Sequence, residues 1–178
     1  MPRFYLIFMN REFTQDKINK SDEFYTLEYA IKPLLKYIPS DKTIWCPFDK
    51  EESNFVKLLR ENGNTVISGH IEEGKNFFEY EPQNYDMIIS NPPYSLRTQI
   101  LERLFLIGKP FALLINESGL FDTKKRYEML KNNPFEIMVF DKRVHYKKNG
   151  IVKKQEPFKS IYLCSQLLPS KFVFSVLS

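Results

Sequence analysis

An asparagine, two prolines and a tyrosine follow one another at Asn91–Tyr94, one polar residue after the apolar run Tyr85–Ile89. The paired prolines keep the backbone stiff and extended, because proline fixes its own φ and restricts the residue before it. In that geometry the side-chain oxygen of Asn91 and the carbonyl of Pro92 can both accept hydrogen bonds from one exocyclic amine. The ring of Tyr94 can stack on the heterocycle that bears the amine. These residue types, in this order, therefore indicate recognition of an aromatic amine at the end of a strand.

The run Asn91–Tyr94 resembles the signature of the amino-methyltransferases that act on adenine N6 in nucleic acids. Asp22–Thr26 resembles the N-terminal cofactor motif of that family, and Ile44–Asp49 resembles its cofactor strand and turn. Small phage-type members of the family are similar to this chain from Asp22 to Val144. The resemblance implies a seven-stranded methyltransferase sheet with a late antiparallel strand at Ile161–Cys164. It also implies S-adenosylmethionine as the methyl donor.

The chemistry implied by the resemblance is methyl transfer to a poor nucleophile. The lone pair of the adenine amine delocalises into the ring, and two well-placed acceptors localise it for attack on the sulfonium methyl. Positioning and electrostatics carry such a reaction, and the target base must leave its stack or already be single-stranded. The resemblance assigns the catalytic role to Asn91, Pro92, Pro93 and Tyr94. The alternative is a proline-rich turn that caps a following helix, with Ser95 near its start.

On the cofactor side, the candidate residues lie near the ends of the expected strands. They are Tyr25, Thr26, Pro47, Phe48, Asp49, Asn76 and Phe77. Cys46 stands at the usual acidic position of the family, and the charged run Lys50–Glu52 replaces its glycines, which restricts close approach of the backbone to a ligand.

We expect a specific chemical role for some of the cofactor candidates, and two of them also fit a structural role. Asp49 or Glu51 is expected to hold the methionine ammonium, and the oxygen of Asn76 can accept a hydrogen bond from the adenine amine of the cofactor. Thr26 also fits a helix N-cap, and Phe77 also fits a core position.

The segment Asp141–Lys159 is rich in basic residues and ends near an aromatic one. The basic candidates for nucleic-acid binding are Lys142, Arg143, Lys147, Lys148, Lys153 and Lys154. We predict a basic loop that neutralises phosphates beside the site, with a solvated, mobile loop as the alternative. Phe158 resembles the family residue that stacks on the second face of the target base, and its alternative is a loop aromatic that enters the core.

Hydrophobic periodicity predicts helices and strands in alternation along the chain. We expect helices at Glu28–Ile38, Ser53–Glu61, Arg97–Ile107 and Lys124–Leu130. We expect strands at Thr43–Cys46, Thr65–Ile67, Tyr85–Ile89, Phe111–Ile115, Phe135–Phe140, Ile161–Cys164 and Phe172–Val176. Such alternation implies parallel pairing, with ligands at the carboxyl ends of the strands. The predicted fold class is α/β, a doubly wound, mostly parallel Rossmann-like sheet resembling the class I S-adenosylmethionine-dependent methyltransferase fold.

Composition bounds the remaining possibilities. The 178 residues, 43% of them hydrophobic, predict a single globular domain. The resemblance implies that this domain is methyltransferase-like, and from the length we expect no separate target-recognition domain. A net charge of +4 permits a nucleic-acid partner and disfavours an acidic DNA mimic. Cys46 and Cys164 fall in apolar runs and indicate a reducing cytoplasm, and the two histidines have no metal-ligand spacing. No apolar run approaches membrane-spanning length.

Two functional hypotheses from different classes follow. The first is S-adenosylmethionine-dependent methyl transfer to adenine N6 in DNA, with RNA as the less favoured substrate. The second is a catalytically degenerate methyltransferase-fold binding protein, such as a phage inhibitor whose protein partner belongs to a host nucleic-acid-targeting defence. The cofactor turn at Cys46–Glu52 favours the second hypothesis, and the complete motif at Asn91–Tyr94 favours the first.

Overall fold

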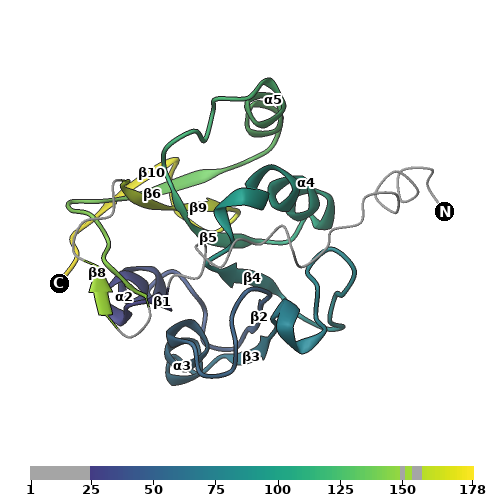
Figure 1. The fold of residues 1–178 in the computed structure, drawn as a ribbon, viewed down its shortest axis with the longest axis vertical. Helices are drawn as coiled ribbons and strands as arrows, with labels where there is room; N and C mark the ends of the chain where they lie inside the picture. The colour runs from purple at the N-terminus through teal and green to yellow at the C-terminus, as the bar shows by residue number, and fades with distance from the viewer. Residues whose placement is uncertain (1–24, 149–150, 154–157) are drawn as a thin grey trace.

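A seven-stranded sheet forms the centre of the computed structural model, which describes residues 25–148, 151–153 and 158–178 (Figure 1). Across the sheet the strand order is β10-β6-β9-β5-β4-β2-β3. The strands are β2 (Thr43–Cys46), β3 (Thr65–Ser68), β4 (Met87–Ser90), β5 (Phe111–Asn116), β6 (Glu136–Phe140), β9 (Ser160–Ser165) and β10 (Phe172–Ser175). Only β9 runs antiparallel to its two neighbours, β5 and β6. The predicted fold class and the late antiparallel strand are therefore confirmed.

Helices cover both faces of this sheet. The α-helices are α2 (Glu28–Leu35), α3 (Asn54–Glu61), α4 (Arg97–Ile107) and α5 (Lys124–Asn132). Buried residues of α2 and α3 join one apolar cluster, and those of α4 and α5 join another. Figure 1 shows the first pair below the sheet and the second pair above it. The sheet is doubly wound because its two faces are both apolar and each needs a helical layer.

Strand β4 shows how the sequence produces this two-faced core. Ile89 packs in the cluster of α2 and α3, whereas Ile88 packs in the cluster of α4 and α5. Successive side chains of a strand point to opposite faces, so a continuous apolar run supplies both cores at once. The strand begins at Met87 rather than at the predicted Tyr85, because Asp86 is taken up by hydrogen bonds to Thr43.

A small second sheet corrects the prediction of a basic loop. It has the order β1-β7-β8, with β1 (Tyr25–Thr26), β7 (Tyr146–Lys148) and β8 (Ile151–Lys153). Part of the basic segment is therefore an antiparallel hairpin. Buried Tyr146 anchors it through a hydrogen bond of 2.7 Å between its hydroxyl and the Ser160 hydroxyl. In the sequence, the dipeptide Asn149-Gly150 is of a type common in tight hairpin turns. The prediction of a loop gave more weight to the lysine-rich composition than to this dipeptide.

Thr26 belongs to β1 and is not the cap of α2, which is Leu27.

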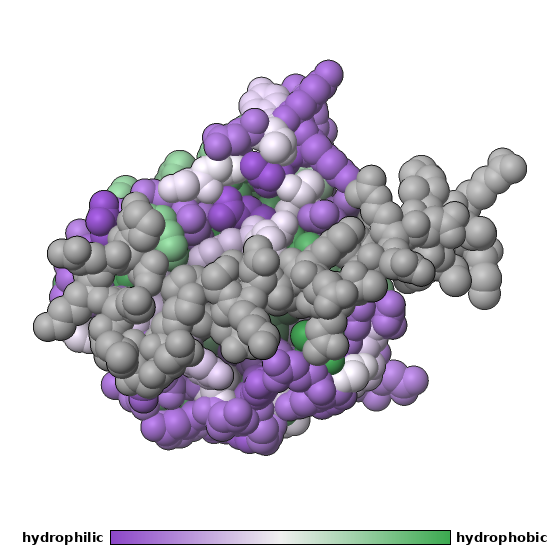
Figure 2. All heavy atoms as spheres, viewed as in Figure 1, coloured by the Kyte–Doolittle hydropathy of each residue, from purple (hydrophilic) through white to green (hydrophobic). Residues whose placement is uncertain are grey.

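Within the described ranges, no helix is long and apolar enough to cross a membrane. On the face seen in Figure 2, the described surface over α3 and α5 is mostly hydrophilic. These helices are amphipathic and turn their apolar sides to the sheet.

Candidate active site

The predicted catalytic motif leaves the sheet at the carboxyl end of β4, next to the end of β2. Pro93 has φ −63° and ψ 130° and stands before the 3₁₀-helix η4 (Tyr94–Leu96), which leads into α4. Pro92 is buried and Asn91 is half-buried. The backbone at Pro93 is therefore extended, in agreement with the stiffness expected of the two prolines. Ser95 is exposed and makes no cap for α4, whose N-cap residue is Leu96.

The Asn91 side chain is held by the first described strand. Its Nδ2 donates to Thr26 Oγ1 at 3.2 Å, and Thr26 is 6% exposed. The carbonyl of Thr26 in turn accepts a hydrogen bond of 2.8 Å from Asn54 Nδ2, at the start of α3. This contact directs the nitrogen of the Asn91 amide toward β1, so its acceptor oxygen is the opposite end of the group.

A buried carboxylate lies beneath the motif. Asp49 accepts a short hydrogen bond from the Ser90 hydroxyl, which itself accepts a bond of 3.2 Å from the backbone N–H of Phe48. Burial raises the pKa of Asp49 to about 6, while hydrogen bonds from Ser90, Ser53 and the backbone of Asn91 lower it. Asp49 therefore links the β2 turn directly to the first residue of the motif.

Among the described residues, no cation pairs with this carboxylate. No Lys or Arg in the described part of the chain forms an ion pair with Asp49, which is 7% exposed. Glu51, the other acid considered for the methionine ammonium, pairs with Arg60 at 2.5 Å and accepts from the Ser68 hydroxyl at 2.8 Å. A buried anion without a partner is costly, so Asp49 is the acid that suits a positively charged ligand group.

The turn after β2 is tied to the end of β3. The backbone N–H of Gly69 donates to the carbonyls of Cys46 and Asp49 at 3.0 and 3.1 Å. Beyond these bonds, Lys50 pairs with Glu72 at 2.5 Å. Two of the charged residues that replace the usual glycines, Lys50 and Glu51, thus have partners of their own. Cys46 is a buried thiol whose pKa burial raises strongly.

The remaining cofactor candidates lie in three different environments. Phe77 is 3% exposed, with its ring 5.4 Å from Trp45 and 4.9 Å from Phe48 between centroids. The side-chain oxygen of Asn76 accepts from the backbone of Phe78 at 3.1 Å. Pro47 is buried, and Tyr25 is 48% exposed. The structure therefore gathers Thr26, Phe48 and Asp49 around the motif, with Phe77 packed behind Phe48.

The ring of Tyr94, the last residue of the motif, lies next to the ring of Phe158. Tyr94 and Phe158 lie edge to face, with centroids 5.3 Å apart and planes at 81°. Tyr146 of β7 is also near Phe158, at 6.3 Å. A base stacked between the two rings requires them to separate and turn parallel, so the sandwich on the target base stays a prediction.

The predicted basic residues follow β6 and continue into the hairpin. Lys142, Arg143 and Lys147 are exposed, Lys148 and Lys153 lie in β7 and β8, and Lys154 lies outside the described residues. Because β7 pairs with β1, and Thr26 of β1 bonds Asn91, the hairpin is coupled to the motif through one strand. No group of three or more His, Cys, Asp or Glu among the described residues is placed to hold a metal ion.

Sequence reasoning missed two residues of this site. Ser90 bridges Phe48 and Asp49, and Asn54 holds Thr26. A polar side chain at the end of an otherwise apolar strand was the available signal for Ser90, whereas nothing in the local pattern distinguished Asn54 from an ordinary helix start.

Comparison with known proteins connects this geometry to DNA modification. No protein-family model matches the chain. The Type II methyltransferase M.EcoRI of Escherichia coli is 24% identical over 176 residues, an alignment that covers 70% of this chain and 54% of that enzyme. The crystal structure of a modification subunit assigned to a type I restriction enzyme from Vibrio vulnificus YJ016 matches with a TM-score of 0.52 and 13% identity. That match covers 92% of this chain and 49% of the subunit.

The chain thus spans about half the length of each of these two proteins. The structural match establishes the fold, and the sequence match to a methyltransferase agrees with the motif at the end of β4. The sequence match supports a relationship between this chain and a DNA methyltransferase.

Proposed function

We propose that this chain transfers a methyl group from S-adenosylmethionine to adenine N6 in DNA. One observation carries the proposal: the motif Asn91–Tyr94 leaves β4 with its asparagine amide oriented by Thr26 and its tyrosine ring beside Phe158. The acceptor oxygen of Asn91 and the carbonyl of Pro92 would hold the adenine amine, and Tyr94 would stack on the base. Two acceptors on one amine localise its lone pair, which is the activation that this weak nucleophile needs.

The donor set beside the motif fits the cofactor. S-adenosylmethionine supplies an electrophilic methyl group on a sulfonium, together with an ammonium and an adenine. Asp49 would hold the cationic end, because its buried carboxylate has no ion-pair partner among the described residues and a nearby positive charge offsets its desolvation. Phe48, backed by Phe77, would contact the apolar part of the cofactor.

DNA is favoured as the substrate by the relationship to DNA methyltransferases and by the exposed basic residues near the motif. Lys142, Arg143 and Lys147 are exposed on the segment that leads into and includes β7, which pairs with β1, the strand that holds Asn91 through Thr26. Lysine and arginine supply the phosphate contacts that dominate nucleic-acid affinity. The base itself must be flipped or single-stranded to reach a carbonyl at a strand end.

The test is a methylation assay with S-adenosylmethionine and adenine-containing oligonucleotides, as single- and double-stranded DNA and as RNA. The product is N6-methyladenine, measured by mass spectrometry of the nucleosides. Asn91→Ala should lower the rate by about 100-fold or more, the typical loss when one stabilising hydrogen-bonding group is removed. Asn91→Asp keeps an acceptor oxygen and should retain more activity than Asn91→Ala. Asn132→Ala, at an exposed position of α5, is the matched control and should be as active as the parent protein.

Two outcomes would count against this proposal. N6-methyladenine formation by Asn91→Ala at a rate within a few-fold of the parent would remove Asn91 from the mechanism. Absence of N6-methyladenine from every oligonucleotide, with cofactor binding established by calorimetry, would reject the reaction itself.

A further inference from the structure

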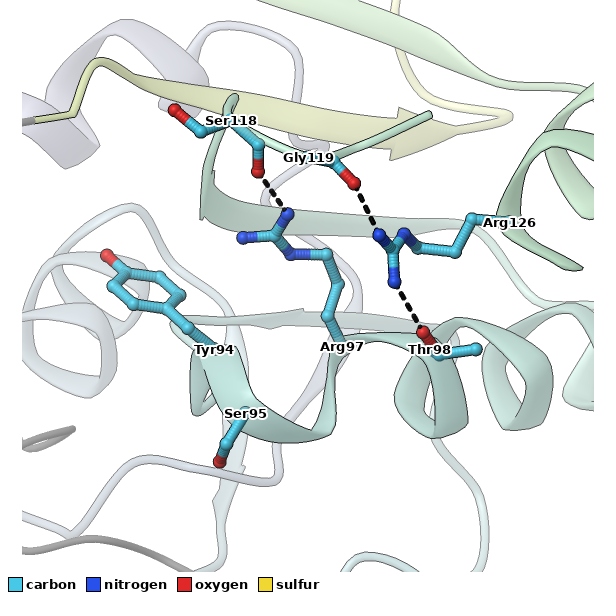
Figure 3. Close-up of a pocket in the computed structure, with 7 residues that line it drawn as sticks. All are labelled: Tyr94, Ser95, Arg97, Thr98, Ser118, Gly119 and Arg126. Carbon is cyan, nitrogen blue, oxygen red and sulfur yellow. Dashed lines mark hydrogen bonds between the residues drawn. The ribbon is translucent and has the colours of Figure 1, made fainter. Parts of the chain in front are cut away.

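A cavity of about 210 Å³ lies directly behind the motif tyrosine. Its lining comes from η4, the start of α4, the loop after β5 and helix α5: Tyr94, Ser95, Arg97, Thr98, Ser118, Gly119 and Arg126. Figure 3 shows the two guanidinium groups side by side beneath the Ser118–Gly119 loop, with the Tyr94 ring on one flank. Measured in this way, a cavity of about 10–15 Å³ holds one water molecule, so this one has room for a tetrahedral anion.

Arg126 is fixed by its surroundings. Its three nitrogens donate to the carbonyls of Leu120 and Gly119 and to the hydroxyl of Thr98, at 3.2, 2.6 and 2.8 Å. These bonds join α5 to α4 and to the loop after β5. The guanidinium is therefore held rigidly, and its charge faces the cavity at a set position.

Fewer nitrogens of Arg97 than of Arg126 donate hydrogen bonds to described residues. Its Nη1 donates to the carbonyl of Ser118 at 2.6 Å, while its Nε is buried and has no acceptor within the described part of the chain. Burial and the nearby charge of Arg126 lower the pKa of Arg97, and the carboxylate of Asp122 opposes them from beyond ion-pair distance. Because neither arginine has an ion-paired carboxylate in the described ranges, the two leave an excess of positive charge in the cavity.

We infer that this cavity binds a phosphodiester of the DNA strand that carries the target base. Guanidinium groups suit phosphate because they offer several donors in one plane, and the Thr98 hydroxyl, which accepts from Arg126, lies beside them. The proximity of Tyr94 places the phosphate within a nucleotide or so of the stacked base. This inference rests on the proposed function, since it assumes that the ring of Tyr94 faces a nucleic-acid base.

A phosphate site in this cavity would also fix the position of the DNA strand along the protein. Contacts to phosphates position a nucleic-acid strand, whereas contacts to bases read it. A phosphate held behind the motif would fix the flipped nucleotide relative to Asn91, three residues before Tyr94. Lys147, exposed on β7, would act farther along the strand.

The test measures binding of single-stranded DNA with one adenine, by fluorescence anisotropy and without methyl donor, so that it does not depend on catalysis. Arg97→Gln should weaken binding by about 10-fold or more, as expected for a lost charge-assisted hydrogen bond. It should also reduce the slope of log K against log salt by about 0.7. Lys125→Gln is the matched control, because Lys125 is exposed, pairs with Glu102 at 2.7 Å and does not line the cavity. It should change affinity by less than about three-fold.

A scan with neutral methylphosphonates then locates the phosphate. Replacing one phosphate beside the adenine should weaken binding to the parent protein by about the same factor as Arg97→Gln. The same replacement should have little further effect on the variant. Equal methylphosphonate penalties in both proteins, or equal affinities of Arg97→Gln and Lys125→Gln, would overturn the inference. If Arg97→Gln does not fold, a scan of the parent in which no position beside the adenine stands out overturns it equally.

Competition with inorganic phosphate separates a strand site from a free-anion site. Phosphate that displaces DNA no better than chloride at equal ionic strength agrees with a site for the strand. Strong competition together with a silent methylphosphonate scan would show a pocket for free anions and would refute the inference. Asn91→Ala should keep the methylphosphonate effect while losing methyl transfer, which distinguishes failure here from failure of the proposed function.

Discussion

The substitution Asp49→Asn should make this protein more stable at neutral pH. Asp49 is buried beneath the motif, and burial raises its pKa from 3.8 to about 6. A group whose pKa is raised in the folded state destabilises folding wherever it is ionised. Above about pH 6 the folded protein carries the full cost of the buried charge, and below about pH 4 that cost is gone because both states are protonated.

The size of the effect follows from the shift. A difference of about two pKa units corresponds to roughly 3 kcal/mol of unfolding free energy. Asparagine keeps one acceptor oxygen for the Ser90 hydroxyl or the Asn91 backbone, but it loses the second acceptor, at a cost of about 1 kcal/mol. The net gain at neutral pH should therefore be about 2 kcal/mol, or about 4–8 °C in Tm for a domain of this size.

The assay is urea unfolding of the parent and variant proteins at several values between about pH 4 and pH 8. The stability difference should be largest at the upper end and should shrink toward pH 4. Glu72→Gln provides a control of opposite sign, because the Lys50 ammonium lowers the pKa of the exposed Glu72 carboxylate. Its difference from the parent should be a loss of stability that disappears as Glu72 becomes protonated in both states.

An Asp49→Asn protein that is less stable than the parent at neutral pH would refute this reasoning. A gain in stability that does not change with pH would also refute it, because the gain is attributed only to removal of the carboxylate charge, and that charge depends on pH. S-adenosylmethionine binding supplies the functional counterpart: if Asp49 holds its cationic end, the stabilised variant should bind it at least about 10-fold more weakly in calorimetry.

Two further predictions concern the same edge of the sheet. Ser90→Ala should destabilise the fold by about 1–3 kcal/mol in urea unfolding, because the Phe48 N–H and the Asp49 carboxylate each lose a partner. The loss should be greater near pH 8 than near pH 4, and a pH-independent loss would contradict the role given to Asp49. Neutralising Lys147, Lys148, Lys153 and Lys154 together should weaken DNA binding and lower its salt slope by up to about 3, whereas an unchanged slope would exclude the hairpin from phosphate contact.

The main elements of the fold could be predicted from local patterns alone. Helix Arg97–Ile107 was expected with the bounds that α4 has, and the run Thr43–Cys46 is β2 as predicted. Apolar spacing depends only on near neighbours in the chain, so it can be recognised without knowledge of the fold. The hairpin of β7 and β8 was missed because its lysines outweighed the turn signal between its strands.

The site was predictable only in part. The motif Asn91–Tyr94 could be recognised because its four residues are consecutive, so no knowledge of the fold is needed to find it. The residues that hold it are distant in sequence: Thr26 lies 65 residues from Asn91, and Asp49 lies 41 residues from Ser90. Such pairs depend on which strands become neighbours, and hydrophobic periodicity contains no information on strand order.

By itself, the sequence determined an α/β chain whose strands and helices alternate and whose third sheet strand is followed by the stiff motif Asn91–Tyr94. The two prolines and the apolar runs impose those features through local sterics and burial. Only the tertiary structure decided that β1 and its basic hairpin lie against Asn91, that Asp49 is buried without an ion-pair partner among the described residues, and that Arg97 and Arg126 share a cavity. Those arrangements arise when crossovers bring separate strand and helix ends together, because charge and burial at a site are properties of the assembled neighbours rather than of any one segment.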